Sequence, residues 1–261
     1  MKKYLVIGNP IEHSLSPKLH NHWIKENNID AKYEKKQLNE TDIEVMISEV
    51  RDAKIDGINV TVPFKKSVIP FLDKLTPIAQ EVQSVNTIFK KDNKVIGDNT
   101  DVSGFEQGLK HIKYSAKNKK VFILGAGGVA PSIILALKRL GASKIILSNR
   151  TKEKAEDLKK IYSNLEIVDW GENVDFDMII NATSLGLKNE DQIKLNFSKI
   201  GSNKLFYDVI YNPNKTNFLL EGKKLGHKTE NGKMMFIYQA QLAFRIWHNI
   251  LPKINNKLLD Q

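Results

Sequence analysis

The second half of the chain alternates short apolar runs with amphipathic segments. Its apolar runs predict buried strands at 121–124, 144–148, 166–168, 178–181 and 205–209. Two segments between them, 130–140 and 151–162, carry apolar residues at helical spacing. Strand and helix in regular alternation predict a parallel sheet with crossover helices.

The first hundred residues predict a mixed α/β unit. Strands are expected at 4–8, 32–37 (an edge strand) and 58–62, followed by a hairpin of 85–89 and 94–97 that turns at Asp92 and Asn93. Helices are expected at 17–27 with Ser16 as N-cap, at 41–53, at about 66–72 and after Pro77. In segment 41–53 one face is apolar and is formed by Ile43, Met46, Ile47 and Val50.

Two further helices complete the pattern. One is expected over 101–111, where it bridges to the second unit, and the other over 234 to about 251. We therefore predict an α/β protein of two domains with a cleft between them. Residues 1–101, completed by the C-terminal helix segment 234–261, form one domain, and residues 102–233 form the other.

Composition narrows the class of protein. The chain has 261 residues, of which 41% are hydrophobic and none is cysteine, so disulfides, a thiol nucleophile and a cysteine-held metal are excluded. The six histidines lack metal spacing, and no apolar run is long enough for a membrane span. These features predict a cytoplasmic, metal-free protein with no membrane partner, present as a monomer or homodimer.

The net charge of +10 raises the possibility of nucleic-acid binding. The lysines are spread along the whole chain, however, without a basic strip interleaved with aromatic residues. A generally basic surface is the simpler interpretation, and such a field would also steer anionic small molecules.

A glycine-rich turn follows the strand at 121–124. Gly125, Gly127 and Gly128, with Ala126 and Val129 between and after them, precede the helix that starts at Ala130. Glycines let the backbone approach a pyrophosphate closely, and a helix N-terminus favours the negative charge. The turn predicts a dinucleotide site.

The end of the next strand indicates which dinucleotide binds. An acidic residue there would accept hydrogen bonds from a ribose 2′-hydroxyl, whereas this chain has Asn149, Arg150 and Thr151, followed by Lys152 and Lys154. A guanidinium and a hydroxyl suit a phosphate monoester, which favours NADP(H) over NAD. A solvated basic turn is the alternative.

Polar residues of the first domain are candidates for chemistry. Strand periodicity puts Asn59 and Thr61 on one face, and Lys65 follows at the strand end. The hairpin turn brings Asn86 opposite the residues just before Asp101. An ordinary amphipathic strand, a surface lysine and a helix-terminal aspartate remain the alternatives.

The start of the helix at 17–27 is a natural site for a carboxylate or phosphate. Ser16 is explained by capping, whereas Ser14 has no structural reason in the sequence. His13, His20 and His22 could act as bases, but His20 and His22 are expected on a helix flank.

An ordered set of segments resembles the shikimate dehydrogenase family over nearly the whole chain. The matching segments are 8–21, 59–65, 85–87, 97–101, 125–128, 149–151, 181–186, 207–213 and 239–244. The resemblance implies reversible reduction of 3-dehydroshikimate to shikimate with NADPH, in the aromatic amino acid route to chorismate. It also implies an N-terminal substrate domain and a Rossmann-like NADP domain.

The resemblance assigns roles to residues. It implies that Ser14 and Ser16 hold the substrate carboxylate. The ring hydroxyls would be bound by Thr61, Lys65, Asn86, Asp101 and Gln239, with Tyr211 closing the pocket. The pyrophosphate would lie on 125–129 and the 2′-phosphate ribose on 149–154. Thr183, Val209 and Gly232 would lie near the nicotinamide.

Lys65 is the predicted acid and base, with Asp101 as its partner. A partly desolvated lysine has a lowered pKa, so it can exchange a proton near neutrality. Two other functions remain as alternatives. The first is a quinate/shikimate enzyme that uses NAD, and the second is a catalytically silent NADP-binding sensor. Arg150 argues against the first, and the presence of Lys65 and Asp101 argues against the second.

Overall fold

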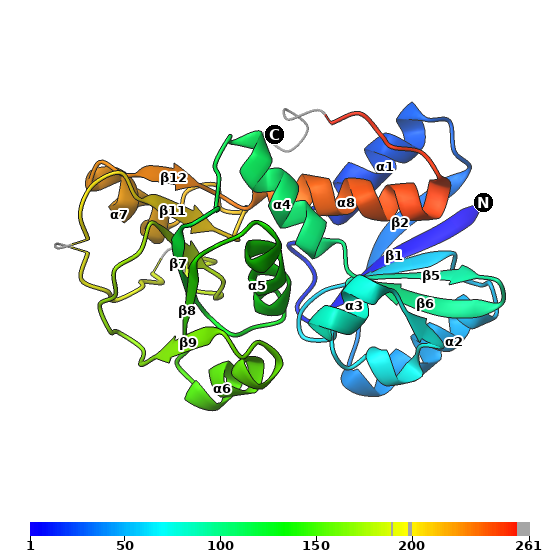
Figure 1. Ribbon diagram of the computed structural model, residues 1–261. Helices are drawn as coiled ribbons and strands as arrows, with labels where there is room; N and C mark the ends of the chain where they lie inside the picture. Colours follow the sequence, from blue (N-terminus) through cyan, green and yellow to red (C-terminus); the bar gives the residue numbers. More distant parts are fainter. Residues whose placement is uncertain (189, 198–199, 255–261) are drawn as a thin grey trace. The chain divides into compact units, whose positions relative to one another are not determined.

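The chain folds as two compact units in the computed structural model, which describes residues 1–188, 190–197 and 200–254 (Figure 1). The first unit comprises Met1–Gly104 and Ile237–Gln261, and the second comprises Phe105–Phe236. Helices α4 (Asp101–His111) and α8 (Lys233–His248) each contain one of the boundaries between them. The predicted α/β class with two sheets is confirmed.

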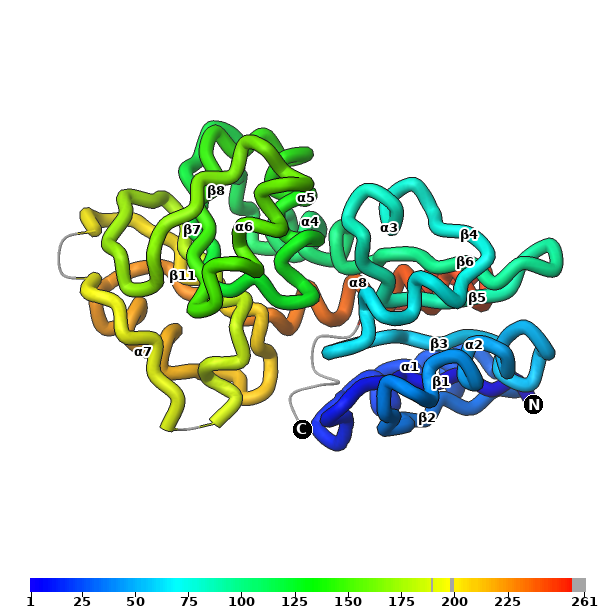
Figure 2. Tube along the Cα trace, turned by 90° about the horizontal axis from the view of Figure 1, so that it is seen from below, coloured from blue at the N-terminus to red at the C-terminus, as the bar shows by residue number. Residues whose placement is uncertain are grey.

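The first unit is built on a mixed six-stranded sheet. Its strands in spatial order are β2 (Ala31–Gln37), β1 (Lys2–Gly8), β3 (Gly57–Val60), β5 (Thr87–Lys91), β6 (Lys94–Asp98) and β4 (Lys74–Leu75). β1 pairs in parallel with both β2 and β3, whereas β5 is antiparallel to β3 and β6. Figure 2 shows β1 between its two parallel neighbours. The edge strand and the hairpin were both predicted.

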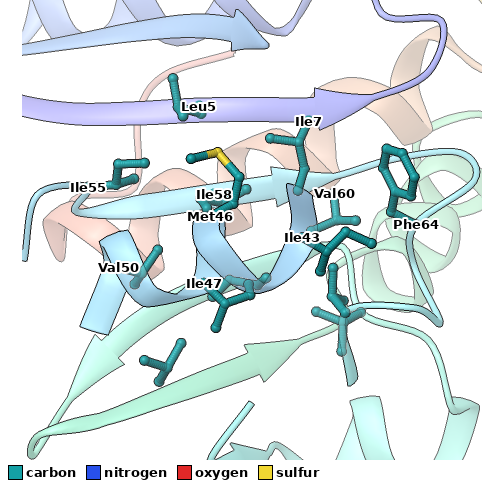
Figure 3. Packing of buried hydrophobic residues seen from close by; sticks show 14 of the residues in the cluster. Leu5, Ile7, Ile43, Met46, Ile47, Val50, Ile55, Ile58, Val60 and Phe64 are labelled. Atoms are coloured by element: carbon teal, nitrogen blue, oxygen red, sulfur yellow. The ribbon is translucent and has the colours of Figure 1, made fainter. Parts of the chain in front are cut away.

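One face of this sheet is covered by α2 (Ile43–Arg51) and α3 (Pro77–Val82). The apolar stripe of α2, predicted from its spacing, is fully buried and points at the strands (Figure 3). Leu5 and Ile7 of β1 and Ile58 and Val60 of β3 lie opposite it in the same cluster. Alternation along each strand therefore sends one set of side chains toward α2.

The other face is covered by α1 (Ser16–Glu26) and α8, through aromatic contacts. Trp23 of α1 packs on Phe244 of α8, with ring centroids 5.7 Å apart. His20 lies inside this group, stacked on the ring of Tyr33 at 4.3 Å and 6°. Neither of its ring nitrogens has a hydrogen-bond partner among the described residues. His20 is therefore a packing residue rather than a catalytic base.

Burial makes the stability of this cluster sensitive to acid. Desolvation lowers the pKa of His20 to about 3, from 6.5 when solvated, and His248 nearby lowers it as well. Between these values the unfolded chain binds the extra proton, so the free energy of unfolding falls as pH falls, by at most about 1.4 kcal/mol per pH unit. We expect His20→Leu to flatten this acid slope. Urea unfolding at several pH values from 4.5 to 7 measures it.

His13→Leu is the matched control, because His13 is exposed and its variant should keep the wild-type slope. Equal slopes for wild type and His20→Leu would show that His20 is not the group that titrates. The comparison uses slopes, so a general loss of stability from lost stacking does not affect it.

The second unit contains an entirely parallel six-stranded sheet. In spatial order its strands are β12 (Lys228–Glu230), β11 (Leu205–Asp208), β10 (Met178–Asn181), β7 (Lys120–Leu124), β8 (Lys144–Ser148) and β9 (Leu165–Val168). Taken along the chain, this is the order 3-2-1-4-5-6 of a Rossmann fold, with the switch point between β7 and β10. The carboxyl ends of these two strands therefore border the expected ligand crevice.

Helices connect these strands. α5 (Ala130–Arg139) follows β7, α6 (Lys152–Ile161) follows β8 and α7 (Asn217–Lys224) precedes β12. All side chains from Ala130 to Leu137 are buried, as a crossover helix over a central strand requires. On the opposite face, Phe218 and Leu219 of α7 pack with Phe206 in an aromatic core.

Several boundaries differ from the predictions. β3 ends at Val60, two residues early, and Val62 beyond it is 56% exposed. The helix expected at 66–72 is a single 3-10 turn, Ile69–Phe71, because Pro70 and the short apolar run allow no longer helix. α8 ends at His248 and not near 251, and residues 255–261 of the predicted C-terminal segment lie outside the described residues. β4, α7 and β12 were not predicted.

No described helix is long and apolar enough to cross a membrane.

Candidate functional site

A buried ion pair joins Lys65 and Asp101 in the first unit. Lys65 Nζ lies 2.6 Å from Asp101 Oδ2, and the two side chains are only 10% and 8% exposed. Lys65 follows the end of β3, while Asp101 is the first residue of α4. The predicted partnership is therefore present as a direct contact.

Backbone contacts fix both members of this pair. The carbonyl of Lys65 accepts the N–H of Val85 at 2.8 Å, which ties the segment after β3 to the start of the hairpin. Asn99 Oδ1 accepts the N–H groups of Asp101 and Val102 at 3.1 and 3.2 Å, so its side chain caps α4. A buried charged pair is costly to desolvate. The presence of such a pair just after β3 and at the start of α4 therefore indicates a candidate site for proton transfer.

Asn86 lies at the centre of a second polar group beside the pair. Its Oδ1 accepts the N–H of Thr100 at 2.8 Å, and its Nδ2 donates to Thr100 Oγ1 at 2.9 Å. Nδ2 also lies 3.4 Å from Gln239 Oε1 on α8. The hairpin therefore brings Asn86 to the residue before Asp101, as the predicted turn required, and α8 adds Gln239.

A hydrogen-bond ladder continues from Asn86 across the sheet. Thr87 Oγ1 donates to Asn86 Oδ1 at 3.0 Å and accepts Asn59 Nδ2 at 3.1 Å. Asn59 Oδ1 in turn accepts the hydroxyl of Tyr33, on the edge strand β2, at 2.7 Å. This ladder of Tyr33, Asn59, Thr87 and Asn86 satisfies each buried polar group and orients the Asn86 amide.

The two serines at the start of α1 differ from the prediction in their local structure. Ser16 is the first helical residue and is buried, so Leu15 and not Ser16 occupies the N-cap position. Ser14 Oγ instead accepts the N–H of Ser16 at 3.3 Å. The expectation that Ser16 caps the helix and that Ser14 has no structural role is thus wrong, because the helix starts one residue earlier. Thr61 lies just beyond β3, and its methyl group packs against Gly8.

The glycine turn of the second unit has the geometry of a phosphate cradle. Gly125 has φ +104°, and a Cβ there would lie 2.9 Å from the carbonyl of Ala182, so only glycine fits. A Cβ on Gly127 would have no neighbour closer than the Ala182 oxygen at 3.9 Å, which leaves open space over the turn. Val129 then precedes α5, whose first residue Ala130 is fully buried.

The end of β8 adds a polar and basic turn. Asn149 Oδ1 accepts the N–H of Ala126 at 3.0 Å and thereby joins this turn to the glycine turn. Lys152 is held by Asp169 at 2.6 Å. Arg150, Thr151 and Lys154 are exposed, and within the described ranges neither Arg150 nor Lys154 forms an ion pair. Their charges are available to an anion.

The remaining predicted residues of the second unit lie past the ends of β10, β11 and β12. Thr183 Oγ1 donates to Asn181 Oδ1 at 2.7 Å. Gly232 passes so close to the carbonyl of Val209 that any Cβ would clash with it. Tyr211 stacks on Phe236 with ring centroids 4.3 Å apart. Thr183 and Val209 thus follow adjacent strands, at the carboxyl edge where the glycine turn also lies.

The predicted residues form two groups, one in each unit. Direct contacts join Lys65 with Asp101 and Asn86 with Gln239, whereas Ser14 and Ser16 lie apart from these contacts, at the start of α1. Tyr33, Thr87 and Asp208 support these groups, although no pattern in the sequence predicted a role for them. A polar residue inside an otherwise apolar strand, such as Asp208 after Phe206 and Tyr207, is the signal that could have revealed them.

Two family models match the chain. Residues 6–88 match the shikimate dehydrogenase substrate binding domain, and residues 107–196 match shikimate / quinate 5-dehydrogenase. The first match includes Lys65 and Asn86, and the second includes the glycine turn.

Similar proteins cover the chain from end to end. Shikimate dehydrogenase (NADP(+)) of Pelagibacter ubique is 60% identical over 99% of this chain and 98% of its own length. The crystal structure of shikimate dehydrogenase from Aquifex aeolicus superposes with a TM-score of 0.91 at 37% identity, covering 100% of this chain and 96% of that one. A Thermus thermophilus shikimate 5-dehydrogenase, solved with NADP(H) and shikimate, has a TM-score of 0.88 at 31% identity and covers 97% of this chain and 95% of that one.

Proposed function

The chain belongs to the shikimate dehydrogenase family, and we propose that it uses NADP(H) to reduce 3-dehydroshikimate reversibly to shikimate in chorismate biosynthesis. The observation that carries this proposal is the buried pair of Lys65 and Asp101 beside the Asn86 group. It combines a proton donor with several hydrogen-bonding groups suited to a polyhydroxylated ring.

Lys65 is proposed as the acid and base. Bound NADPH supplies a hydride to the ketone carbon, which leaves negative charge on the carbonyl oxygen. Lys65 Nζ donates a proton to that oxygen, and in the reverse direction it removes the hydroxyl proton. Asp101 orients the ammonium group through its 2.6 Å contact and accepts a substrate hydroxyl. A charged partner held in place before the reaction lowers the cost of reorganisation.

Other residues would bind the rest of the substrate. Ser14 and Ser16 are proposed to hold its carboxylate, since both lie at the N-terminal end of α1, where the helix dipole favours an anion. Ring hydroxyls are assigned to Thr61, Asn86 and Gln239, with Tyr211 as a further substrate contact. The hydrogen bonds around Asn86 support its assignment, because they leave its amide in one defined orientation.

The second unit fits NADP(H). The open space over Gly127 and the restricted backbone of Gly125 suit a pyrophosphate on Gly125, Ala126, Gly127, Gly128 and Val129. Asn149, Arg150, Thr151 and Lys154 would hold the ribose and its 2′-phosphate. Thr183, Val209 and Gly232 would contact the nicotinamide end, and the close approach of Gly232 to the carbonyl of Val209 keeps these two backbone segments together.

This function implies the partners and the location of the protein. We propose small-molecule partners, with no nucleic acid or membrane, and a cytoplasmic location in keeping with the biosynthetic role. We propose a substrate domain of residues 1–101, completed by the segment from 234 onward, and an NADP domain of residues 102–233. A monomer or a homodimer fits the proposal, and light scattering on the purified chain distinguishes the two.

The test is NADP⁺ reduction dependent on shikimate, followed by absorbance of the reduced cofactor. Parallel reactions contain quinate instead of shikimate, or NAD⁺ instead of NADP⁺. We expect a strong signal only with shikimate and NADP⁺. Binding of NADPH without turnover of either acid would refute the proposal and favour a silent NADP-binding sensor. Equal rates with NAD⁺ would refute the assignment of Arg150.

A further inference from the structure

Asp208 is a buried carboxylate to which the proposed reaction assigns no role. It is the last residue of β11, and its exposed fraction is 0%. No lysine or arginine among the described residues forms an ion pair with it. Burial raises its pKa to about 6, against the opposing effect of its hydrogen-bond donors. A buried acid without a cation is unusual enough to require an explanation.

Three chain segments donate hydrogen bonds to this carboxylate. Asn181 Nδ2, at the end of β10, donates to Oδ1 at 3.1 Å, and the N–H of Ile210 donates to Oδ1 at 3.0 Å. Thr216 Oγ1, at the N-cap of α7, donates to Oδ2 at 2.6 Å. The carboxylate thus joins the segments that follow two adjacent strands with the start of a helix.

Asn181 passes this constraint to Thr183. Its Oδ1 accepts both the N–H and the hydroxyl of Thr183, at 3.1 and 2.7 Å. Its Nδ2, besides binding Asp208, donates to the carbonyl of Leu185 at 2.9 Å. Thr183 Oγ1 then accepts the N–H of Leu185 at 3.0 Å. Because the Asn181 amide makes three of these four bonds within the turn, its orientation determines the conformation of the 182–185 turn.

Asp208 selects that orientation. A carboxylate oxygen only accepts, so it must face the Nδ2 side of Asn181 and leave Oδ1 for Thr183. We propose that Asp208 is a positioning residue that, through Asn181, holds Thr183 in place at the nicotinamide end of the cofactor site. This inference rests on the proposed contact of Thr183 with the nicotinamide. Misplacement of a reacting group by about 1 Å can cost on the order of 100-fold in rate.

The test compares Asp208→Ala with Asp208→Asn in steady-state kinetics. Alanine removes every acceptor, so we expect kcat to fall by about 10- to 100-fold while both KM values change by less than about threefold. Asparagine keeps an oxygen for Asn181 and Ile210, and its amide can donate to Thr216. We therefore expect it to restore kcat to within about threefold of wild type. Phe206→Leu, in the same strand, is the control for lost stability and should keep its kcat.

Three results would overturn the inference. These are an Asp208→Ala kcat equal to that of Phe206→Leu, a rise in the KM for shikimate as large as the loss of kcat, and an Asp208→Asn variant as impaired as the alanine variant. If Asp208→Ala does not fold, Asn181→Ala removes the acceptor of Thr183 directly and must lower kcat likewise.

Thr183→Ala separates this inference from the proposed function. If it leaves kcat and the KM for NADP⁺ unchanged, the assignment of Thr183 to the cofactor is wrong. If it lowers kcat while Asp208→Ala does not, the cofactor assignment holds and only the positioning role of Asp208 fails.

Discussion

Replacing Lys65 with alanine is expected to lower kcat by about 10²- to 10⁴-fold while the KM for shikimate changes far less. The ammonium group touches Asp101 at 2.6 Å and is the proposed source of the proton that neutralises the developing alkoxide. Without it, that charge must be neutralised by water or by a more distant group. The loss therefore falls on the transition state rather than on substrate binding.

Steady-state kinetics of shikimate oxidation measure this prediction, with Lys66→Ala as the matched control. Lys66 is the next residue and is exposed, so its variant should behave like wild type. Equal losses in kcat and in substrate affinity for Lys65→Ala would indicate that Lys65 only binds substrate.

Stability needs a separate control, because the alanine variant leaves Asp101 buried without its partner. Breaking a buried ion pair in this way costs about 3–5 kcal/mol. The double variant Lys65→Met with Asp101→Asn removes both charges and should recover much of that loss. It should stay inactive, which separates the catalytic effect from the structural one.

Replacing Arg150 with alanine is expected to raise the KM for NADP⁺ by about 10- to 100-fold, since a hydrogen bond to a charged group contributes about 1.5–3 kcal/mol. Arg150 is exposed at the end of β8, and no carboxylate in the described part of the chain pairs with it. Its guanidinium is therefore free to bind the 2′-phosphate in a bidentate manner. NAD⁺ lacks this phosphate, so the lower kcat/KM expected with NAD⁺ should not change in the Arg150→Ala variant.

The measurement is kcat/KM for NADP⁺ and for NAD⁺ with the same enzyme preparation. Lys159→Ala is a suitable control, because Lys159 is an exposed cation at the far end of α6. An equal loss with both cofactors would place Arg150 outside the 2′-phosphate site. The effect should also weaken with rising salt, as for any exposed charge pair.

The sequence predicted the framework well where periodicity and turn chemistry agreed. The stripe of Ile43, Met46, Ile47 and Val50 and the turn at Asp92 and Asn93 allow little choice of structure, and both are present. Once the turn is fixed, the register of β5 and β6, which pairs Thr87 with Asp98, brings Asn86 close to Thr100, so that contact followed from local rules.

Predictions failed where short segments depend on tertiary contacts. β4 has two residues and β12 has three, so neither carries a detectable alternation. Ser16 is not the N-cap, because the helix starts one residue earlier than predicted, and a shift of one residue in a helix start lies within the error of any sequence rule. The partners of Asp208 come from three separate segments, and no local pattern encodes their meeting.

The ladder from Tyr33 to Asn86 constrains how this sequence can change over evolution. Asn59 Oδ1 is buried and accepts the hydroxyl of Tyr33, a residue of the edge strand with no proposed contact to substrate. A change of Tyr33 to phenylalanine would leave the Asn59 oxygen without this donor. A change of Asn59 alone would remove the acceptor of this hydrogen bond from the Tyr33 hydroxyl. Positions 33 and 59 should therefore change together among relatives. A library made to broaden substrate choice should vary them as a pair.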